Sequence, residues 1–212
     1  VQFNQFAGAE MLAKKYELTQ DELNAFAFDS HVKAKKAVEE GRFQDEIVAI
    51  EVELEDGSLE MHSQDEGIRM DATLGAIAGL QPLQEGGLLT AANASQICDG
   101  AAAVMIANGE ACKRLGLKPL ARIVAMSVIG SDPVIMLEGP IPATKKVLEK
   151  AGLSMDDIDL FEVNEAFGSV PLAWSKAMKA DLSKLNVNGG AQALGHPLGS
   201  TGAKLMATMV HE

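Results

Sequence analysis

The stretch Asn186-Val-Asn-Gly-Gly-Ala-Gln-Ala-Leu-Gly-His-Pro-Leu-Gly-Ser-Thr-Gly-Ala203 indicates both a fold and a site. It contains five of the 20 glycines and one of the 4 histidines, His196. Glycine permits positive φ angles and close approach of the backbone. Pro197 disfavours the α region at the residue before it, so we expect His196 in an extended turn. Gly199-Ser-Thr-Gly202 then opens an apolar segment at helical spacing, which predicts that a helix begins just behind the histidine.

Two interpretations of this glycine-rich loop remain open from residue types alone. The spacing of Gly195, Gly199 and Gly202 matches neither the dinucleotide nor the phosphate-loop pattern, so a tight connection with an incidental histidine is one alternative. A functional loop is the other. Asn164 and Glu165 favour it, because they follow a predicted strand, and ligands gather at the carboxyl ends of strands in α/β sheets.

Composition narrows the class of protein. The 212 residues are 47% hydrophobic with a net charge of −12, which indicates one or two globular domains with a substantial core. No apolar run approaches the roughly 20 residues of a membrane span, so we expect no membrane partner. The acidic charge argues against a nucleic-acid surface, which needs a basic stripe, although a local basic patch can still bind an anionic ligand.

The cysteines and the remaining histidines suggest no further chemistry. Cys98 and Cys112 make no disulfide framework, so we predict a cytoplasmic location and packed thiols. Nothing after Val1 resembles a signal peptide, and both chain ends look cut. His31 is expected to pack or to lie at the surface, and His62 has no metal-ligating neighbours, so no metal site is predicted.

The periodicity along the chain predicts alternating helices and strands, which is typical of an α/β protein. Helices are expected over 5–17, from the capping box Thr19-Gln-Asp-Glu22 to Gly41, near 73–80, and over 109–116, 142–151, 170–178 and from 199 onward. Lys33, Lys35 and Lys36 are interpreted as a solvated face. Strands are expected over 47–54, 101–107, 120–129 and 159–163, with a turn at Asp56-Gly57 and an otherwise irregular, lid-like stretch over 55–97. The apolar strand 101–107 has no flanking strands in 1–97, so its partners are expected outside this chain.

Four motifs together resemble the thiolase family: Val163-Asn-Glu-Ala-Phe167, Gly195-His-Pro-Leu-Gly-Ser-Thr-Gly202, Ala94-Ser-Gln-Ile-Cys-Asp-Gly-Ala-Ala-Ala103 and Gly139-Pro-Ile-Pro142. The resemblance implies a layered αβαβα fold of two similar halves, incomplete here, with an inserted loop (lid) domain. It divides the chain into most of the loop domain (1–97), a return into the N-terminal half (98–118) and most of the C-terminal half (119–212).

The resemblance also implies a reaction, which is thiolytic cleavage of a 3-ketoacyl-CoA by CoA or the reverse Claisen condensation. His196 matches the histidine that activates the nucleophile and helps to bind a thioester oxyanion, and Asn164 matches the asparagine that holds a water in the same oxyanion hole. Positions that match the pantetheine channel are Ser95, Met136, Ala166 and Phe167, and Arg69 matches a lid position near the adenosine end. Coenzyme A is then a substrate with no permanent cofactor, and a homodimer or homotetramer acting in fatty acid and lipid metabolism is expected.

The sequence departs from the family pattern in two places. The segment Asn4-Gln-Phe-Ala-Gly8 differs from the commoner Met-Gly version, which puts the acyl specificity in doubt. Neither catalytic cysteine is present, and the family pattern places the nucleophile before Val1 and the second cysteine, in Cys-x-Gly-Gly-Gly, after Glu212. The alternatives are therefore a non-catalytic half-protein that binds acyl-CoA or a partner, and, ranked lower, a ketoacyl-synthase-like condensing enzyme.

Overall fold

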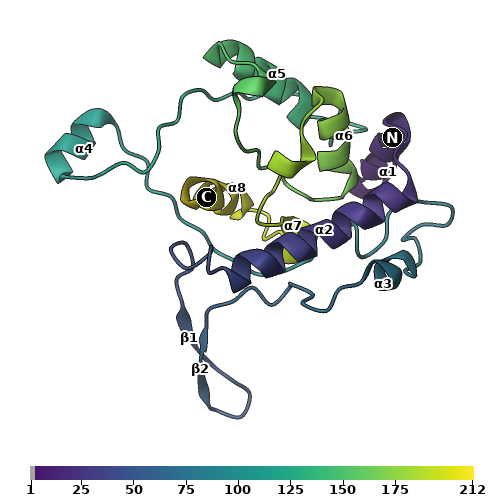
Figure 1. Ribbon diagram of the computed structural model, residues 1–212, viewed down its shortest axis with the longest axis horizontal. Coiled ribbons are helices and arrows are strands. Elements are labelled where there is room, and N and C mark those ends of the chain that lie inside the picture. The colour runs from purple at the N-terminus through teal and green to yellow at the C-terminus, as the bar shows by residue number, and fades with distance from the viewer. Residues whose placement is uncertain (1–2) are drawn as a thin grey trace.

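The computed structural model describes residues 3–212, and its centre is the long helix α2 (Gln20–Glu39). Figure 1 shows α2 crossing the molecule, with α1 (Gln5–Lys15) and α6 (Ser169–Met178) towards its N-terminal end. Helix α1 packs on α6, while α2 contacts α3 (Leu74–Ala78), α6 and α7 (Ala191–Leu194). Helix α2 therefore lies directly against α7, which is part of the glycine-rich stretch.

The start of α2 is set by the predicted capping box. The Thr19 hydroxyl accepts a hydrogen bond from the Glu22 backbone at 3.2 Å, and Glu22 Oε2 accepts one from the Thr19 backbone at 2.7 Å. The buried face of the helix carries Leu23, Phe26, Ala34 and Ala37. This reciprocal cap satisfies two backbone N–H groups and fixes where the helix begins.

One side of α2 is less solvated than predicted. Lys33 is half-buried, pairs with Asp29 at 2.7 Å and donates to the Leu185 carbonyl at 3.1 Å, so the solvated-face prediction is wrong for this lysine. His31 is buried, and its Nδ1 accepts from the Arg69 backbone at 3.1 Å, which confirms that it packs in the core. Both side chains thus connect α2 to other segments.

The apolar core lies between α1, α2 and α6. Trp174 is 2% exposed, receives the edge of Phe161 at a centroid distance of 5.1 Å, and donates from Nε1 to Thr144 at 2.9 Å. That hydrogen bond ties α6 to α5 (Pro140–Ala151), which ends at Gly152 with φ of +68°. Burial of this tryptophan with a satisfied N–H fixes the scaffold behind the loop that follows residue 163.

Residues 50–62 form a hairpin that was predicted only in its first half. Strands β1 (Ile50–Glu53) and β2 (Leu59–His62) pair antiparallel around the expected Asp56-Gly57 turn, where Gly57 has φ of +80°. The expectation of irregular chain over 55–97 is wrong at β2. The predicted patch near 73–80 is confirmed as α3. Both strands are largely exposed, and the hairpin projects away from the helices (Figure 1).

The strands predicted over 101–107 and 120–129 do not form. Neither segment contains an assigned strand, and Met105 and Val128 are 81% and 87% exposed. The segment 159–163 forms only a parallel bridge between Phe161 and Leu185. A strand exists only when a neighbour accepts and donates its backbone hydrogen bonds, and no described residues pair with 101–107 or 120–129. Helix α4 (Gly109–Leu115) lies between them, as predicted.

The C-terminal part completes the helices that position the site. Two short 3-10 turns, Met155–Asp157 and Leu182–Lys184, precede α6 and α7 respectively, and α8 (Thr201–His211) ends the chain. Among residues 3–212, no helix combines the length and apolar character needed to cross a membrane.

Candidate active site

His196 lies in a turn between α7 and α8 whose shape depends on Gly195. Gly195 has φ of +80°, which L side chains rarely adopt, and a Cβ there would overlap the Cys98 sulfur. The His196 backbone N–H donates to the Gln96 carbonyl at 3.1 Å. The histidine therefore has its backbone fixed by a separate segment before any side-chain contact is considered.

The imidazole of His196 contacts two side chains. Nε2 lies 3.3 Å from Asn164 Nδ2, and Nδ1 lies 2.7 Å from Thr201 Oγ1. An amide nitrogen only donates, so Nε2 acts as the acceptor and the ring proton belongs on Nδ1, donated to the threonine hydroxyl. This tautomer leaves the Nε2 lone pair on the Asn164 side.

The protonation state of the His196 imidazole suits a general base. His196 is half-buried, and burial lowers the pKa of its imidazole below the ordinary 6.5. The neutral form therefore predominates at pH 7. A neutral imidazole with an accepting Nε2 can take a proton from a thiol.

Asn164 occupies the turn between Phe161 and α6. Its Oδ1 is buried and has no hydrogen-bond partner among residues 3–212. An unpaired buried carbonyl is costly, and it commonly marks a place where water or a ligand binds. The Asn164 amide thus offers a donor to His196 and a free acceptor at the same point.

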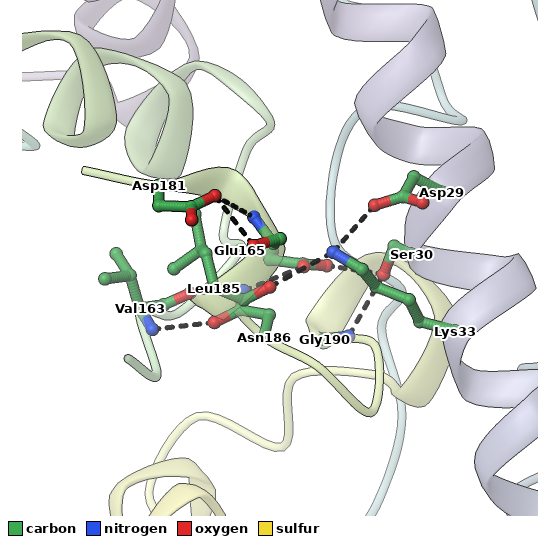
Figure 2. A network of polar contacts seen from close by, with 10 residues as sticks. Asp29, Ser30, Lys33, Val163, Glu165, Asp181, Leu185, Asn186 and Gly190 are labelled. Carbon is green, nitrogen blue, oxygen red and sulfur yellow. Dashed lines mark hydrogen bonds and ion pairs between the residues drawn. The ribbon is translucent and has the colours of Figure 1, made fainter. Parts of the chain in front are cut away.

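Behind this pair lies a buried polar network centred on Glu165. Its carboxyl group accepts from Ser30 Oγ at 2.7 Å, from Asn186 Nδ2 at 2.8 Å and from the Gln192 backbone at 3.1 Å. Figure 2 shows Ser30 reaching in from α2 while Asn186 and Gly190 approach from the glycine-rich loop. Asn186 also accepts from the Val163 backbone and donates to the Val163 carbonyl, at 2.8 and 2.9 Å.

Three of the predicted channel residues meet on a neighbouring segment. Residues 93–95 run antiparallel to 166–168, with Ser95 donating to the Ala166 carbonyl at 3.0 Å and an isolated bridge from Ala94 to Phe167. The Phe167 ring meets the edge of Phe6 at 5.2 Å. Ser95, Ala166 and Phe167 therefore lie together, and Ala166 is two residues from Asn164.

The other two predicted residues, Met136 and Arg69, lie on separate segments of the chain. Met136 has φ of +38° in a loop whose Val134 and Ile135 carbonyls press against Gly8 of α1, where a Cβ would lie 2.9 Å from the Ile135 oxygen. Arg69 has an exposed side chain and bonds through its backbone to His31 on α2. The structure thus places the Met136 loop beside α1 and the Arg69 backbone beside α2.

Sequence reasoning missed several residues that fix the pair. Gln96 donates from Nε2 to the Gly67 and Gln192 carbonyls, each at 2.7 Å, and so connects the backbone at Gly67 to α7. Thr201 binds the histidine ring, and its place in the Ser-Thr pair at the predicted helix start was the available signal. The sequence around Ser30 contains no such signal, because its hydrogen-bond partner Glu165 is 135 residues away in the chain.

The cysteine prediction needs correction. Cys98 is exposed and Cys112 is half-exposed, so they are not the packed thiols expected. Each lies on or beside a segment that has no covering strand, which explains the exposure. Cys98 borders a cavity of about 710 Å³ together with Gly195 and Lys204, but His196 and Asn164 do not line it.

Comparisons with known proteins agree with this geometry. The family profile described as the thiolase N-terminal domain matches residues 3–110, and the thiolase C-terminal domain profile matches 117–212. A steroid 3-ketoacyl-CoA thiolase of Mycobacterium tuberculosis is 51% identical over 100% of this chain and 50% of its own length. An acetyl-CoA acetyltransferase of Allochromatium vinosum is 46% identical over 96% of this chain and 52% of its own.

Solved structures of an acetyl-CoA acetyltransferase and of a 3-ketoacyl-CoA thiolase also superpose on this chain. The Bacillus anthracis acetyl-CoA acetyltransferase superposes with a TM-score of 0.95 at 43% identity, over 99% of this chain and 53% of that one. The human mitochondrial 3-ketoacyl-CoA thiolase in complex with CoA gives 0.89 at 43% identity, over 97% and 51%. These matches confirm the predicted α/β fold. The chain spans about half the length of the curated relatives it matches.

Proposed function

This chain belongs to the thiolase family, and from that premise we propose that the full-length protein is an acyltransferase that exchanges an acyl group between CoA and a 3-ketoacyl-CoA. The observation that carries the proposal is the contact of 3.3 Å between His196 Nε2 and Asn164 Nδ2. It joins a neutral base to an amide with a free buried acceptor, so one group can activate a nucleophile while the other helps to stabilise an oxyanion.

In the proposed reaction His196 acts as the base. Its Nε2 takes the proton from a cysteine thiol that the family pattern places outside this chain, so the S–H bond breaks and an imidazolium forms. The thiolate attacks the 3-keto carbonyl, and the bond between C2 and C3 then breaks to leave an acyl-cysteine and the enolate of acetyl-CoA. A second cysteine, also outside this chain, gives its proton to C2 of that enolate and becomes a thiolate. This thiolate takes the proton of the incoming CoA thiol, the CoA sulfur attacks the acyl-cysteine carbonyl, and the expelled cysteine thiolate recovers its proton from the His196 imidazolium.

We assign Asn164 the role of stabilising the oxyanion. A water bound at its buried amide would donate to the negative oxygen alongside the His196 imidazolium, and fixed donors of this kind contribute about 10²–10³ in kcat each. The cluster of Ser95, Ala166 and Phe167 supports an apolar channel for the pantetheine arm. Met136 is proposed for the same channel, and Arg69 is proposed for the adenosine end of CoA.

Substitution of the histidine in the full-length protein tests this function. We expect His196→Ala to lower kcat for cleavage of a 3-ketoacyl-CoA by CoA by at least about 10²-fold, which is the usual effect of removing a general base. Cys98→Ala and Cys112→Ala should each keep near-normal kcat, because neither thiol is assigned to the reaction. Equal rates for His196→Ala and wild type would refute the proposal.

The acyl chain, the oligomeric state, the cellular location and the metabolic role belong to the same proposal. The relatives' names include both acetyl-CoA acetyltransferase and steroid 3-ketoacyl-CoA thiolase, so they support a CoA thioester without choosing the acyl chain. A homodimer or homotetramer, a cytoplasmic location and a role in fatty acid or lipid metabolism stay predictions. If the full-length protein bound CoA without any turnover, the alternative of a non-catalytic acyl-CoA binder would replace the enzyme.

A further inference from the structure

Glu165 is a buried carboxyl group that the proposed reaction does not use. It is 1% exposed and directly follows Asn164, yet its own side chain turns away into the network shown in Figure 2. Burying a carboxylate is costly unless donors surround it. A group of this kind therefore needs a purpose that outweighs its desolvation.

The donors to Glu165 come from three separate parts of the chain. Ser30 belongs to α2 on the lid side, Asn186 begins the glycine-rich loop, and Gln192 lies in α7, four residues before His196. The Ser30 hydroxyl also accepts from the Gly190 backbone at 3.0 Å, so its own proton is directed at the carboxylate. All three contacts are donated, which fits an ionised carboxylate.

Nearby groups reduce the cost of holding a charge there. Burial raises the pKa of Glu165 overall, and the hydrogen bonds from Asn186, Ser30 and Gln192, together with the Lys33 ammonium, offset part of that rise. Burial, followed by the charge of Glu165, raises the pKa of the neighbouring Glu162 to about 8. Of the two carboxyl groups, the hydrogen-bonded one is therefore the better holder of the negative charge.

We propose that Glu165 is a positioning residue whose carboxylate joins the lid helix α2 to the Asn164 turn and the His196 loop and so sets the separation of that pair. This inference rests on the proposed function and adds a link between the lid and the reacting groups. A displacement of about 1 Å in a catalytic group can cost about 10²-fold in rate, so a small loosening of this junction is enough to be measured.

The test compares three variants of the full-length protein. Glu165→Gln places an amide N–H₂ against donors, and we expect kcat to fall between about tenfold and 100-fold while the KM for CoA changes less than about twofold. Ser30→Ala, which acts from the lid, should lower kcat in the same sense by a smaller factor. Ser175→Ala is the matched control, because its buried hydroxyl bonds only within its own helix, to Leu172 at 2.9 Å, and it should keep the wild-type kcat.

Measurement below the unfolding transition separates positioning from simple destabilisation. We expect the kcat of Glu165→Gln to stay reduced at temperatures well below its thermal midpoint, where the variant is fully folded, and a kcat that returned to the wild-type value there would mean that Glu165 only stabilises the fold. Wild-type kcat in both Glu165→Gln and Ser30→Ala would overturn the inference. So would a Ser175→Ala variant that lost as much kcat as Ser30→Ala. An inactive wild-type protein would instead refute the proposed function, so the two failures are distinguishable.

Discussion

Replacing Gly190 with alanine tests how tightly the Glu165 carboxyl group is packed. A Cβ at this position would lie 2.6 Å from Glu165 Oε2 and would overlap the carboxyl carbon. The backbone is not the obstacle, because Gly190 has φ of −149°, which is ordinary for any residue. The only relief is movement of a carboxylate that three hydrogen bonds hold in place.

The expected magnitude follows from two costs. Overpacking a filled core destabilises by about 1–3 kcal/mol, and each buried donor left without its partner costs about 1–3 kcal/mol more. With at least one hydrogen bond lost, we expect Gly190→Ala to lower the free energy of unfolding by roughly 3 kcal/mol. At roughly 2–4 °C per kcal/mol, the thermal midpoint should fall by about 6 °C or more.

The assay is thermal unfolding followed by circular dichroism, with Gly199→Ala as the control in the same loop. A Cβ at Gly199 meets no atom within 4 Å, so this variant should stay within about 1 °C of wild type. A Gly190→Ala midpoint equal to that of Gly199→Ala would refute the packing argument. In a Glu165→Ala background the Gly190→Ala change should cost much less, because the atoms that it overlaps are gone.

Two further predictions concern His196. Thr201→Val keeps the shape but cannot accept from Nδ1–H, so kcat should fall about tenfold or more at an unchanged thermal midpoint, and unaltered kcat would contradict the assigned tautomer. Because burial lowers the pKa of His196 below 6.5 and the base must be neutral, kcat/KM should be level above pH 6.5 and fall as the pH drops below it. A rate that rises towards acid pH would mean that the protonated imidazole is the active form.

The helices could be predicted because their signals are local. The Thr19–Glu22 capping box, Gly152 after α5 and the Ser-Thr pair at the start of α8 each act within a few residues. The hairpin turn at Asp56-Gly57 was equally local. Strand β2 was missed because its run Leu-Glu-Met-His is short and half polar, and only pairing with β1 makes it a strand.

Long-range contacts could not be predicted from residue types. The apolar run 101–107 predicted a buried strand, and no strand forms there, because pairing is a property of neighbours and not of the run itself. For the site, the pattern singled out Asn164 and His196, and the structure brings them into contact across 32 residues. It gave no hint that Ser30 on the lid helix binds Glu165, because a serine on a helix face usually faces water.

The uncovered segments around α4 have a practical consequence for preparing the protein. Met105, Ile106, Met126 and Val128 expose apolar side chains on extended chain that pairs with no strand among the described residues. Such edges recruit strands from other molecules and seed aggregates. These 212 residues expressed by themselves should therefore accumulate as inclusion bodies, and co-expression with a polypeptide that supplies the adjoining strands should recover them in the supernatant.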